Sequence, residues 1–172
     1  TPCGTLFPYT TLFRSTIVDT ILQKGSFPHG HTYAGSPMAC AVSKTVLDII
    51  LEDGLVENAA AMGKVLGKGL KALEDKHDIV GQARGIGLLW ALEIVRDKET
   101  TDPFPADRHA AETLTRICFD LGLNIYPRHC INGVEGDHVL VAPPLIVNEE
   151  QIGDILKILD EGLTRLAQAL GS

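Results

Sequence analysis

The stretch Phe27-Pro-His-Gly-His-Thr-Tyr-Ala-Gly-Ser-Pro37 is the most informative part of this sequence. It gathers small, hydroxylic and imidazole residues into a turn, and an apolar helix is predicted to begin directly after it. Ser36 is a typical N-cap residue, and Pro37 suits the first position of a helix. Because the N–H groups at a helix N-terminus attract anions, this loop-to-helix junction predicts a seat for an anion such as a phosphate group.

The composition is that of an acidic globular protein. The chain has 172 residues, of which 45% are hydrophobic and 22% charged, and its formal net charge is −7. That length suits one ordinary domain with a real core. The acidic balance, without a basic stripe, argues against a nucleic-acid partner. No apolar run reaches the roughly 18 residues that a membrane helix needs. The four cysteines form no CxxC pair, so we expect reduced thiols and a soluble protein of the cytoplasm.

Residues 1–15 differ from the rest of the chain. They show neither a sustained period of two nor a period of 3.6 residues. The string TLFPYTTLFRS also resembles a translated sequencing adapter. We therefore expect a foreign or disordered lead over residues 1–15, and a native irregular loop is the alternative.

Apolar residues at helical spacing predict four long helices after the Phe27–Pro37 loop. The first runs from Pro37 to a stop at Gly54, and the second follows it, so a corner is expected between them. A third opens at Asp107 and closes at Gly122, and Asn148 caps the last one. Their apolar stripes are Val42, Val46, Ile49 and Ile50; Leu55, Ala59, Met62, Leu66, Leu70 and Leu73; Ala111, Leu114, Ile117, Cys118 and Leu121; and Ile152, Ile155, Leu156, Leu159, Leu163, Leu166 and Leu170.

Three segments have the composition of strands. Residues 84–95 form a β-prone run with glycines at its start, where two backbones can approach closely. Two short strands are predicted at 123–126 and 138–142, and Pro143-Pro144 ends the second. Strands followed by helices that can all cover one face of a sheet predict an α+β fold.

Three motifs resemble those of class-III pyridoxal-phosphate-dependent aminotransferases, in order and at the expected separation. They are His29-Gly-His-Thr-Tyr-Ala-Gly-Ser-Pro37, Val80-Gly-Gln-Ala-Arg-Gly-Ile-Gly-Leu88 and Gly136-Asp-His-Val-Leu-Val-Ala-Pro-Pro-Leu145. The resemblance implies the C-terminal part of a fold type I enzyme. It assigns 16–36 to the end of a large cofactor-binding domain, 37–76 to linking helices, and 77–172 to a small C-terminal domain with a short antiparallel sheet covered by helices.

The resemblance also implies which residues bind the cofactor, pyridoxal 5'-phosphate. Thr32 matches the family's threonine, whose hydroxyl donates to the cofactor phosphate of the neighbouring subunit, and His31 is expected to line the same pocket. From its residue type alone, Thr32 could instead satisfy its own backbone in a turn. The pair His29 and His31 is a poor zinc set, so no metal is expected.

No catalytic residue is assigned to this chain. The family's Schiff-base lysine is expected upstream of Thr16, and Lys24 is too close to Thr32 to serve. A solvated helix-end cation is the ordinary interpretation of Lys24. The chain alone is therefore predicted to bind the cofactor weakly and to have no transaminase turnover.

Departures from the family pattern concern the substrate. Ornithine- and 4-aminobutyrate-type members have an arginine where this chain has Leu140, and members like the diaminopelargonate enzyme have one where it has Tyr126. Arg128, predicted to lie in a flexible loop, is the candidate for binding a substrate carboxylate, because a guanidinium suits bidentate recognition. A solvated loop charge is the alternative, and Arg84 is expected to pair structurally.

The segment Gly133-Val-Glu-Gly-Asp-His138 resembles the amine and ω-amino-acid:pyruvate members. Amine and keto acid substrates and a homodimeric full-length enzyme follow from that resemblance. The alternative is a non-catalytic α+β dimerisation or interaction module. A module of that kind has no need of a donor-rich loop such as the one around Thr32.

Overall fold

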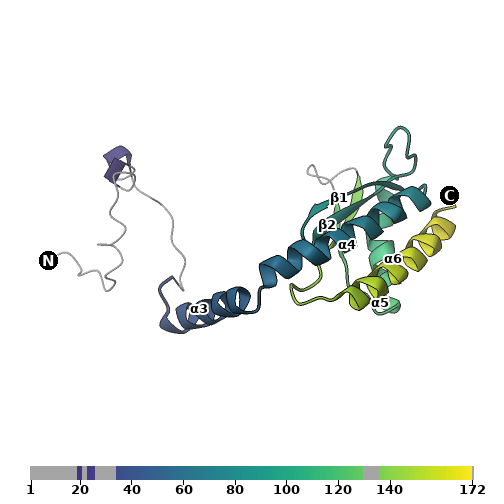
Figure 1. Ribbon diagram of the computed structural model, residues 1–172. Helices are drawn as coiled ribbons and strands as arrows, with labels where there is room; N and C mark the ends of the chain where they lie inside the picture. The colour runs from purple at the N-terminus through teal and green to yellow at the C-terminus, as the bar shows by residue number, and fades with distance from the viewer. Residues whose placement is uncertain (1–18, 21–22, 26–33, 130–135, 172) are drawn as a thin grey trace. The chain divides into compact units, whose positions relative to one another are not determined.

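The computed structural model describes residues 19–20, 23–25, 34–129 and 136–171 (Figure 1). Its contacts divide the chain into two compact units, Thr1–Ile49 and Ile50–Ser172, and each is described by itself. Thr32 and His31 lie outside the described residues. None of the described helices is both long enough and apolar enough to cross a membrane.

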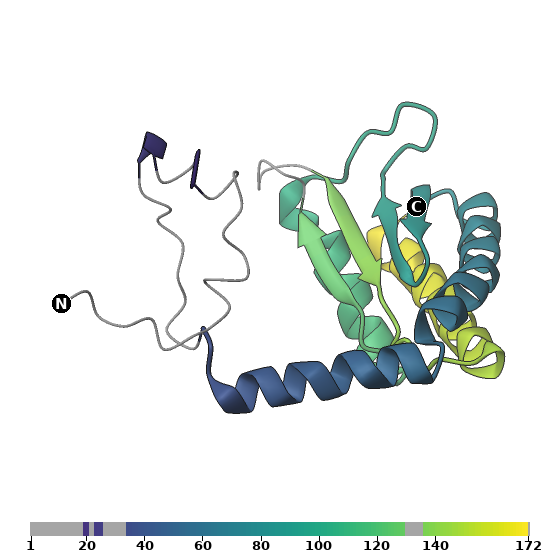
Figure 2. The ribbon, with the colours of Figure 1, turned by 60° about the vertical axis from the view of Figure 1, so that its left-hand side comes forward.

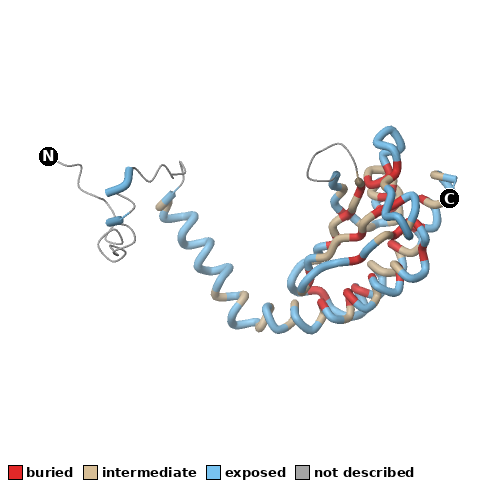
Figure 3. The backbone as a smooth tube through the Cα atoms, turned by 90° about the horizontal axis from the view of Figure 1, so that it is seen from above, coloured by how far each residue is buried: buried red, intermediate tan, exposed pale blue. Residues whose placement is uncertain are grey.

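Helix α3, Pro37–Glu52, accounts for most of what is described in the first unit. It begins at Pro37 as predicted, and the Cys40 N–H donates to the Ser36 carbonyl at 2.9 Å. All sixteen of its residues are described and none is buried. The tube of Figure 3 is accordingly pale along most of this helix, and its apolar side chains, such as Val42 and Val46, are exposed.

Helix α4, Leu55–Lys76, is separated from α3 at Gly54, which adopts a left-handed conformation with φ of 62°. This confirms two helices in place of one continuous rod. Leu66, Leu70 and Leu73 of the predicted apolar stripe are buried. Although α4 falls in the 37–76 range predicted to link two domains, these leucines belong to the core of the second unit.

The described residues contain one four-stranded sheet with the order β1-β2-β4-β3, and all its neighbouring strands are antiparallel. Strands β1, Val80–Ile86, and β2, Leu89–Ile94, form a hairpin (Figure 2). The sequence predicted a single β-prone run over 84–95. The chain reverses within it because Gly87, with φ of 54°, takes a turn conformation that other residues rarely adopt.

Strand β4, Asp137–Val141, agrees with the prediction to within a residue, whereas β3, Tyr126–His129, begins where a strand was expected to end. Pro127, which follows the predicted strand 123–126, lies inside β3. Proline lacks a backbone N–H, but a strand at the edge of a sheet tolerates it, and β3 is such a strand. Arg128 consequently lies in a strand, and its placement in a flexible loop is corrected.

Two helices complete the second unit: α5, Ala110–Asp120, and α6, Glu149–Leu170. Helix α5 begins later than predicted, because residues 106–108 form a short 3₁₀ turn and His109 is left-handed, with φ of 47°. Helix α6 begins as predicted. Asn148 accepts a hydrogen bond from the Gln151 N–H while the Gln151 side chain bonds the Asn148 N–H, which is a capping box.

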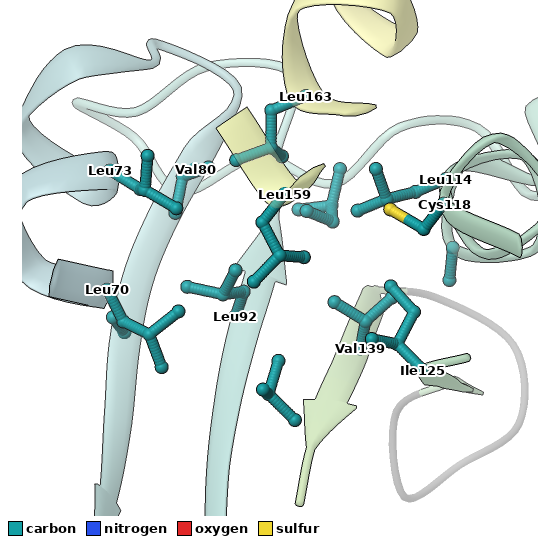
Figure 4. Close-up of a cluster of buried hydrophobic side chains, with 14 of the residues drawn as sticks. Leu70, Leu73, Val80, Leu92, Leu114, Cys118, Ile125, Val139, Leu159 and Leu163 are labelled. Atoms are coloured by element: carbon teal, nitrogen blue, oxygen red, sulfur yellow. The ribbon is translucent and has the colours of Figure 1, made fainter. Parts of the chain in front are cut away.

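The hydrophobic core lies between one face of the sheet and the helices. Helix α4 packs on β1 and β2, α5 packs on β3 and β4, and α6 contacts both helices. Leu159 and Leu163 of α6 belong to this core, and Leu159 points toward Leu92 (Figure 4). Burial of each such side chain stabilises the fold by roughly 1.5–3 kcal/mol. The predicted α+β fold, a short antiparallel sheet covered by helices, is confirmed.

Candidate functional site

Within the described part of the second unit the helices cover one face of the sheet, and alternation along each strand places a second set of side chains on the other face. Along β4, Asp137, Val139 and Val141 are buried, whereas His138 and Leu140 between them are half-buried. The strand register then defines two rows of neighbours on the second face, which we call the open face. The rows are Gln82, Glu93, His138 and Arg128; and Arg84, Ala91, Leu140 and Tyr126.

Tyr126 and Leu140, the two positions where the sequence analysis expects an arginine in other family members, lie directly opposite each other on β3 and β4. The guanidinium carbon of Arg128 lies 5.6 Å from the centroid of the Tyr126 ring. This is a cation–π distance, and such a contact orients the arginine. The structure therefore brings the candidate Arg128 to the same surface as both positions.

Arg128 keeps its hydrogen-bonding capacity. Its side chain is exposed, and no carboxylate of the described residues forms an ion pair with it. Arg84 differs, because its Nη1 donates to Glu93 Oε2 at 3.1 Å and to Gln82 Oε1 at 2.9 Å. Arg84 is thus paired within the sheet, whereas the Arg128 guanidinium, which has five N–H donors, forms no ion pair with a carboxylate in the part of the chain that the structure describes.

His138 separates these two arginines along the open face. Its partial burial, followed by the positive charges of Arg84 and Arg128, lowers the pKa of the His138 imidazole below its ordinary value. His138 is therefore neutral near pH 7. Among the described residues, the open face then carries the guanidinium groups of Arg84 and Arg128 and the carboxylate of Glu93, which pairs with Arg84.

On the side of β3 that faces the helices, three residues form what we call the His129 cluster: Glu112, His129 and Asp137. The His129 Nδ1 lies 2.9 Å from Asp137 Oδ1, and its Nε2 lies 2.6 Å from Glu112 Oε1. The hydrogen bond with Asp137, and then that with Glu112, raises the pKa of the imidazole. Stability from these bonds is therefore fully present below the unfolded pKa of about 6.5 and is lost as the pH rises through the raised folded pKa.

A match to a known family follows from the sequence. The profile described as aminotransferase class-III matches residues 3–163, which is most of the chain. The chain belongs to the class-III aminotransferase family. The match begins inside the segment 1–15, which the sequence analysis expects to be a foreign or disordered lead.

Several relatives of this class-III aminotransferase chain are transaminases by name. An uncharacterized aminotransferase of Schizosaccharomyces pombe is 41% identical over 156 residues, which are 90% of this chain and 34% of that protein. The putrescine–pyruvate aminotransferase of Pseudomonas aeruginosa is 34% identical over 91% of this chain and 33% of its own length. The chain thus spans about a third of the length of the curated relatives it matches.

Solved structures agree with these relatives. A transaminase from the marine bacterium Virgibacillus superposes with a TM-score of 0.79 at 32% identity, over 90% of this chain and 34% of that one. The ω-transaminase of Pseudomonas jessenii in complex with PMP gives a TM-score of 0.73 at 35% identity, over 90% and 32%. The class-III aminotransferase fold is therefore shown for most of the chain.

The His129 cluster consists of residue types that also ligate metals, and its ligand atoms all lie within 4.8 Å of one another. Here both ring nitrogens already face carboxylate oxygens at hydrogen-bond distance. A ring that donates from both nitrogens is an imidazolium, which has no lone pair for a metal. The geometry is that of a charged ring held between two carboxylates. The pair His29 and His31 lies outside the described residues.

The sequence analysis missed the His129 cluster. Its members come from α5, β3 and β4, and no spacing in the sequence relates them. Asp137 was noted only as part of a motif, yet it is 7% exposed and its Oδ2 accepts a bond from the Ala110 N–H at 3.0 Å. A buried aspartate at the start of a strand indicates that its carboxylate needs a hydrogen-bond partner. The sequence does not identify that partner.

Proposed function

We propose that this chain is the C-terminal part of a pyridoxal-phosphate-dependent aminotransferase that moves an amino group from an amine or ω-amino acid to a keto acid. The observation that carries the proposal is the class-III match over residues 3–163. Two relatives act, by their names, on putrescine with pyruvate and on gamma-aminobutyrate. Two of the solved neighbours were crystallised with PMP.

In this proposal Thr32 and His31 bind the cofactor phosphate next to the N-terminus of α3. The described part of that junction fits an anion, because α3 starts at Pro37 and its first turn holds no acidic residue. Free N–H groups at a helix start and a hydroxyl donor both suit a phosphate. The cofactor, when bound, supplies the electron sink that makes the amino group transferable. The role proposed for Thr32 and His31 is to bind the cofactor's phosphate.

Arg128 is proposed to bind the carboxylate of the substrate. The support is its exposure, its available donors and its orientation against Tyr126 on the open face. Tyr126 and Leu140 offer an aromatic and an aliphatic surface where related enzymes place an arginine. That exchange favours an amine, or an amino acid whose carboxylate is far from the reacting amino group. It disfavours a substrate whose carboxylate must sit at either of those two positions.

The remaining parts of the proposal concern the whole protein. Turnover is expected to need the two thirds of the enzyme that relatives have beyond the length matched here, including the lysine that carries the cofactor. A homodimer follows from the expected reach of Thr32 into a neighbouring subunit. The cytoplasm is the proposed compartment, supported by the free thiols of Cys40 and Cys118 among the described cysteines.

A chimeric enzyme tests the proposal. Residues 16–172 replace the matching segment of the Pseudomonas putrescine–pyruvate aminotransferase, and cofactor affinity and turnover are measured. Thr32→Val is expected to weaken cofactor binding by about 10- to 100-fold, since a hydrogen bond to a charged group contributes roughly 1.5–3 kcal/mol. Thr32→Ser is the matched control, because it keeps the hydroxyl and should keep the affinity.

Two outcomes contradict the proposal. A chimera that binds the cofactor equally well with threonine and with valine removes Thr32 from the phosphate site. A chimera that folds and dimerises but neither binds the cofactor nor turns over favours the interaction module instead.

A further inference from the structure

We propose that His129 is a positioning residue whose protonated ring, held between Glu112 and Asp137, fixes the edge strand β3 and with it the stacked Tyr126–Arg128 pair on the open face. The expected effect on carboxylate binding rests on the role proposed for Arg128 under the proposed function. The positioning of Arg128 by His129 does not depend on that role.

The first step is that β3 has few other attachments in the described structure. It is four residues long and has one neighbouring strand, β4. One of the four is Pro127, which lacks a backbone N–H. Three of its side chains, Tyr126, Arg128 and His129, are exposed. A short edge strand of this kind depends on side-chain contacts for its position.

The second step is that the His129 cluster joins β3 to two rigid neighbours. Asp137 is the first residue of β4, and its Oδ2 also accepts from the N–H of Ala110, the first residue of α5. Glu112 lies in the first turn of α5. The imidazole therefore connects the end of β3 to both β4 and α5. If Asp137 moved, the buried N–H of Ala110 would lose its hydrogen-bond acceptor. The position of Asp137 is therefore fixed.

The third step is the alternation of the strand. In the register of β3 with β4, His129 is opposite Asp137 and Arg128 is opposite His138. Successive side chains of a strand point to opposite faces. The bonds that hold His129 on the helix side thus fix the backbone from which Arg128 projects to the open face, where it stacks on Tyr126.

The fourth step is charge. A neutral imidazole donates from only one nitrogen, so loss of its proton leaves one of the two carboxylates facing a lone pair. The groups facing the ring are Glu112 from α5 and Asp137 from β4. Arg108, His109 and Arg116 line a hollow of about 400 Å³ beside Glu112. On the far side of the sheet stand Arg128 and His138. Deprotonation of His129 is therefore expected to release the end of β3 and loosen the Arg128 stack.

Nuclear magnetic resonance on the 172-residue chain can test this directly. The Arg128 guanidinium lies over the Tyr126 ring, so the ring current of Tyr126 is expected to shift the neighbouring δ-methylene resonance of Arg128, and that shift reports the stack. The imidazole nitrogens of His129 report its protonation. Between pH 5.5 and 9.5 the Arg128 shift is expected to move toward its unstacked value in one step, with the same midpoint as His129.

Three variants separate His129 from other causes. His129→Gln, which cannot titrate, should abolish the Arg128 step. His138→Gln is the matched control, because His138 faces Arg128 across the strands, and the step should persist in it. Glu112→Gln is nearly isosteric at this half-buried α5 position and removes one charge, so the midpoints of His129 and of the Arg128 step should fall together.

The proposal is overturned if the Arg128 shift does not change with pH, if the step survives in His129→Gln, or if Glu112→Gln moves the His129 midpoint alone. The last variant decides the matter even where His129→Gln unfolds. Titration with propionate as a carboxylate probe adds the functional arm, and its dissociation constant should rise severalfold above the midpoint. If the Arg128 shift shows the expected step but propionate does not bind at any pH, the substrate role of Arg128 is contradicted. The positioning role of His129 is not.

Discussion

The two faces of the sheet differ in how far their side chains are buried. The covered face presents Ala83, Leu92 and Val139 to the helices, and all three are at most 1% exposed. The open face presents charged and aromatic side chains at the neighbouring positions of the same strands. One residue along the strand thus decides whether a side chain is part of the core or available to a ligand. Substitutions on the two faces should therefore differ in kind as well as in size.

The largest effect is expected on the covered face. Leu92→Ala should lower the free energy of unfolding by about 3 kcal/mol, because it deletes a fully buried side chain and leaves a cavity. Leu89 on the same strand is 56% exposed, and Leu89→Ala should cost less than about 1 kcal/mol. Urea unfolding of both variants measures the difference. Equal losses would mean that the two faces are not distinct.

A smaller effect is expected where α4 meets the covered face. Gly67 lies against the Trp90 ring, and the Cβ of an alanine there would overlap it. Gly67→Ala should destabilise the protein by about 1–3 kcal/mol through overpacking. The matched control is Gly153→Ala in α6, where a Cβ meets nothing within 4 Å. That variant should stabilise by roughly 0.5–1 kcal/mol, because alanine favours a helix. Thermal unfolding showing the same sign for both would contradict this packing.

The smallest effect is expected from the ion pair of the open face. Arg84 and Glu93 are partly exposed, and pairs of this kind contribute about 0.2–1 kcal/mol. Arg84→Ala should therefore change stability by less than about 1 kcal/mol and leave the circular-dichroism spectrum unaltered. A double-mutant cycle with Glu93→Gln isolates the pair. A coupling far above that range would show that the open face also contributes to holding the fold.

Periodicity in the sequence predicted the covered side well. The leucine stripe of α4 and the start of α6 after Asn148 follow from apolar spacing and from capping chemistry, which are local. The antiparallel sheet covered by helices was also predicted. These features depend on residues a few positions apart, so one sequence suffices to detect them.

The open side and its supports were harder to predict. The strand was predicted to end at Tyr126, and nothing local shows that β3 continues through Pro127 at a sheet edge, where proline is allowed. The hairpin at Gly87 was hidden inside a continuous β-prone run. The His129 cluster unites residues 112, 129 and 137, which meet only once β3, β4 and α5 have assembled. Thr32 and His31 stay predictions.

The strand order has a consequence for the folding of this chain during its synthesis on the ribosome. Strand β4 is the last of the four described strands to be synthesised, yet it is inserted between β2 and β3. Until Val141 has emerged from the exit tunnel, β3 has no strand to pair with. The edge of β2 that pairs with β4 in the folded sheet is also unpaired. The nascent chain therefore exposes two unsatisfied strand edges for as long as translation of residues 126–141 takes. During that interval the nascent chain is most prone to aggregate through its unpaired strand edges, and a chaperone has its greatest effect then.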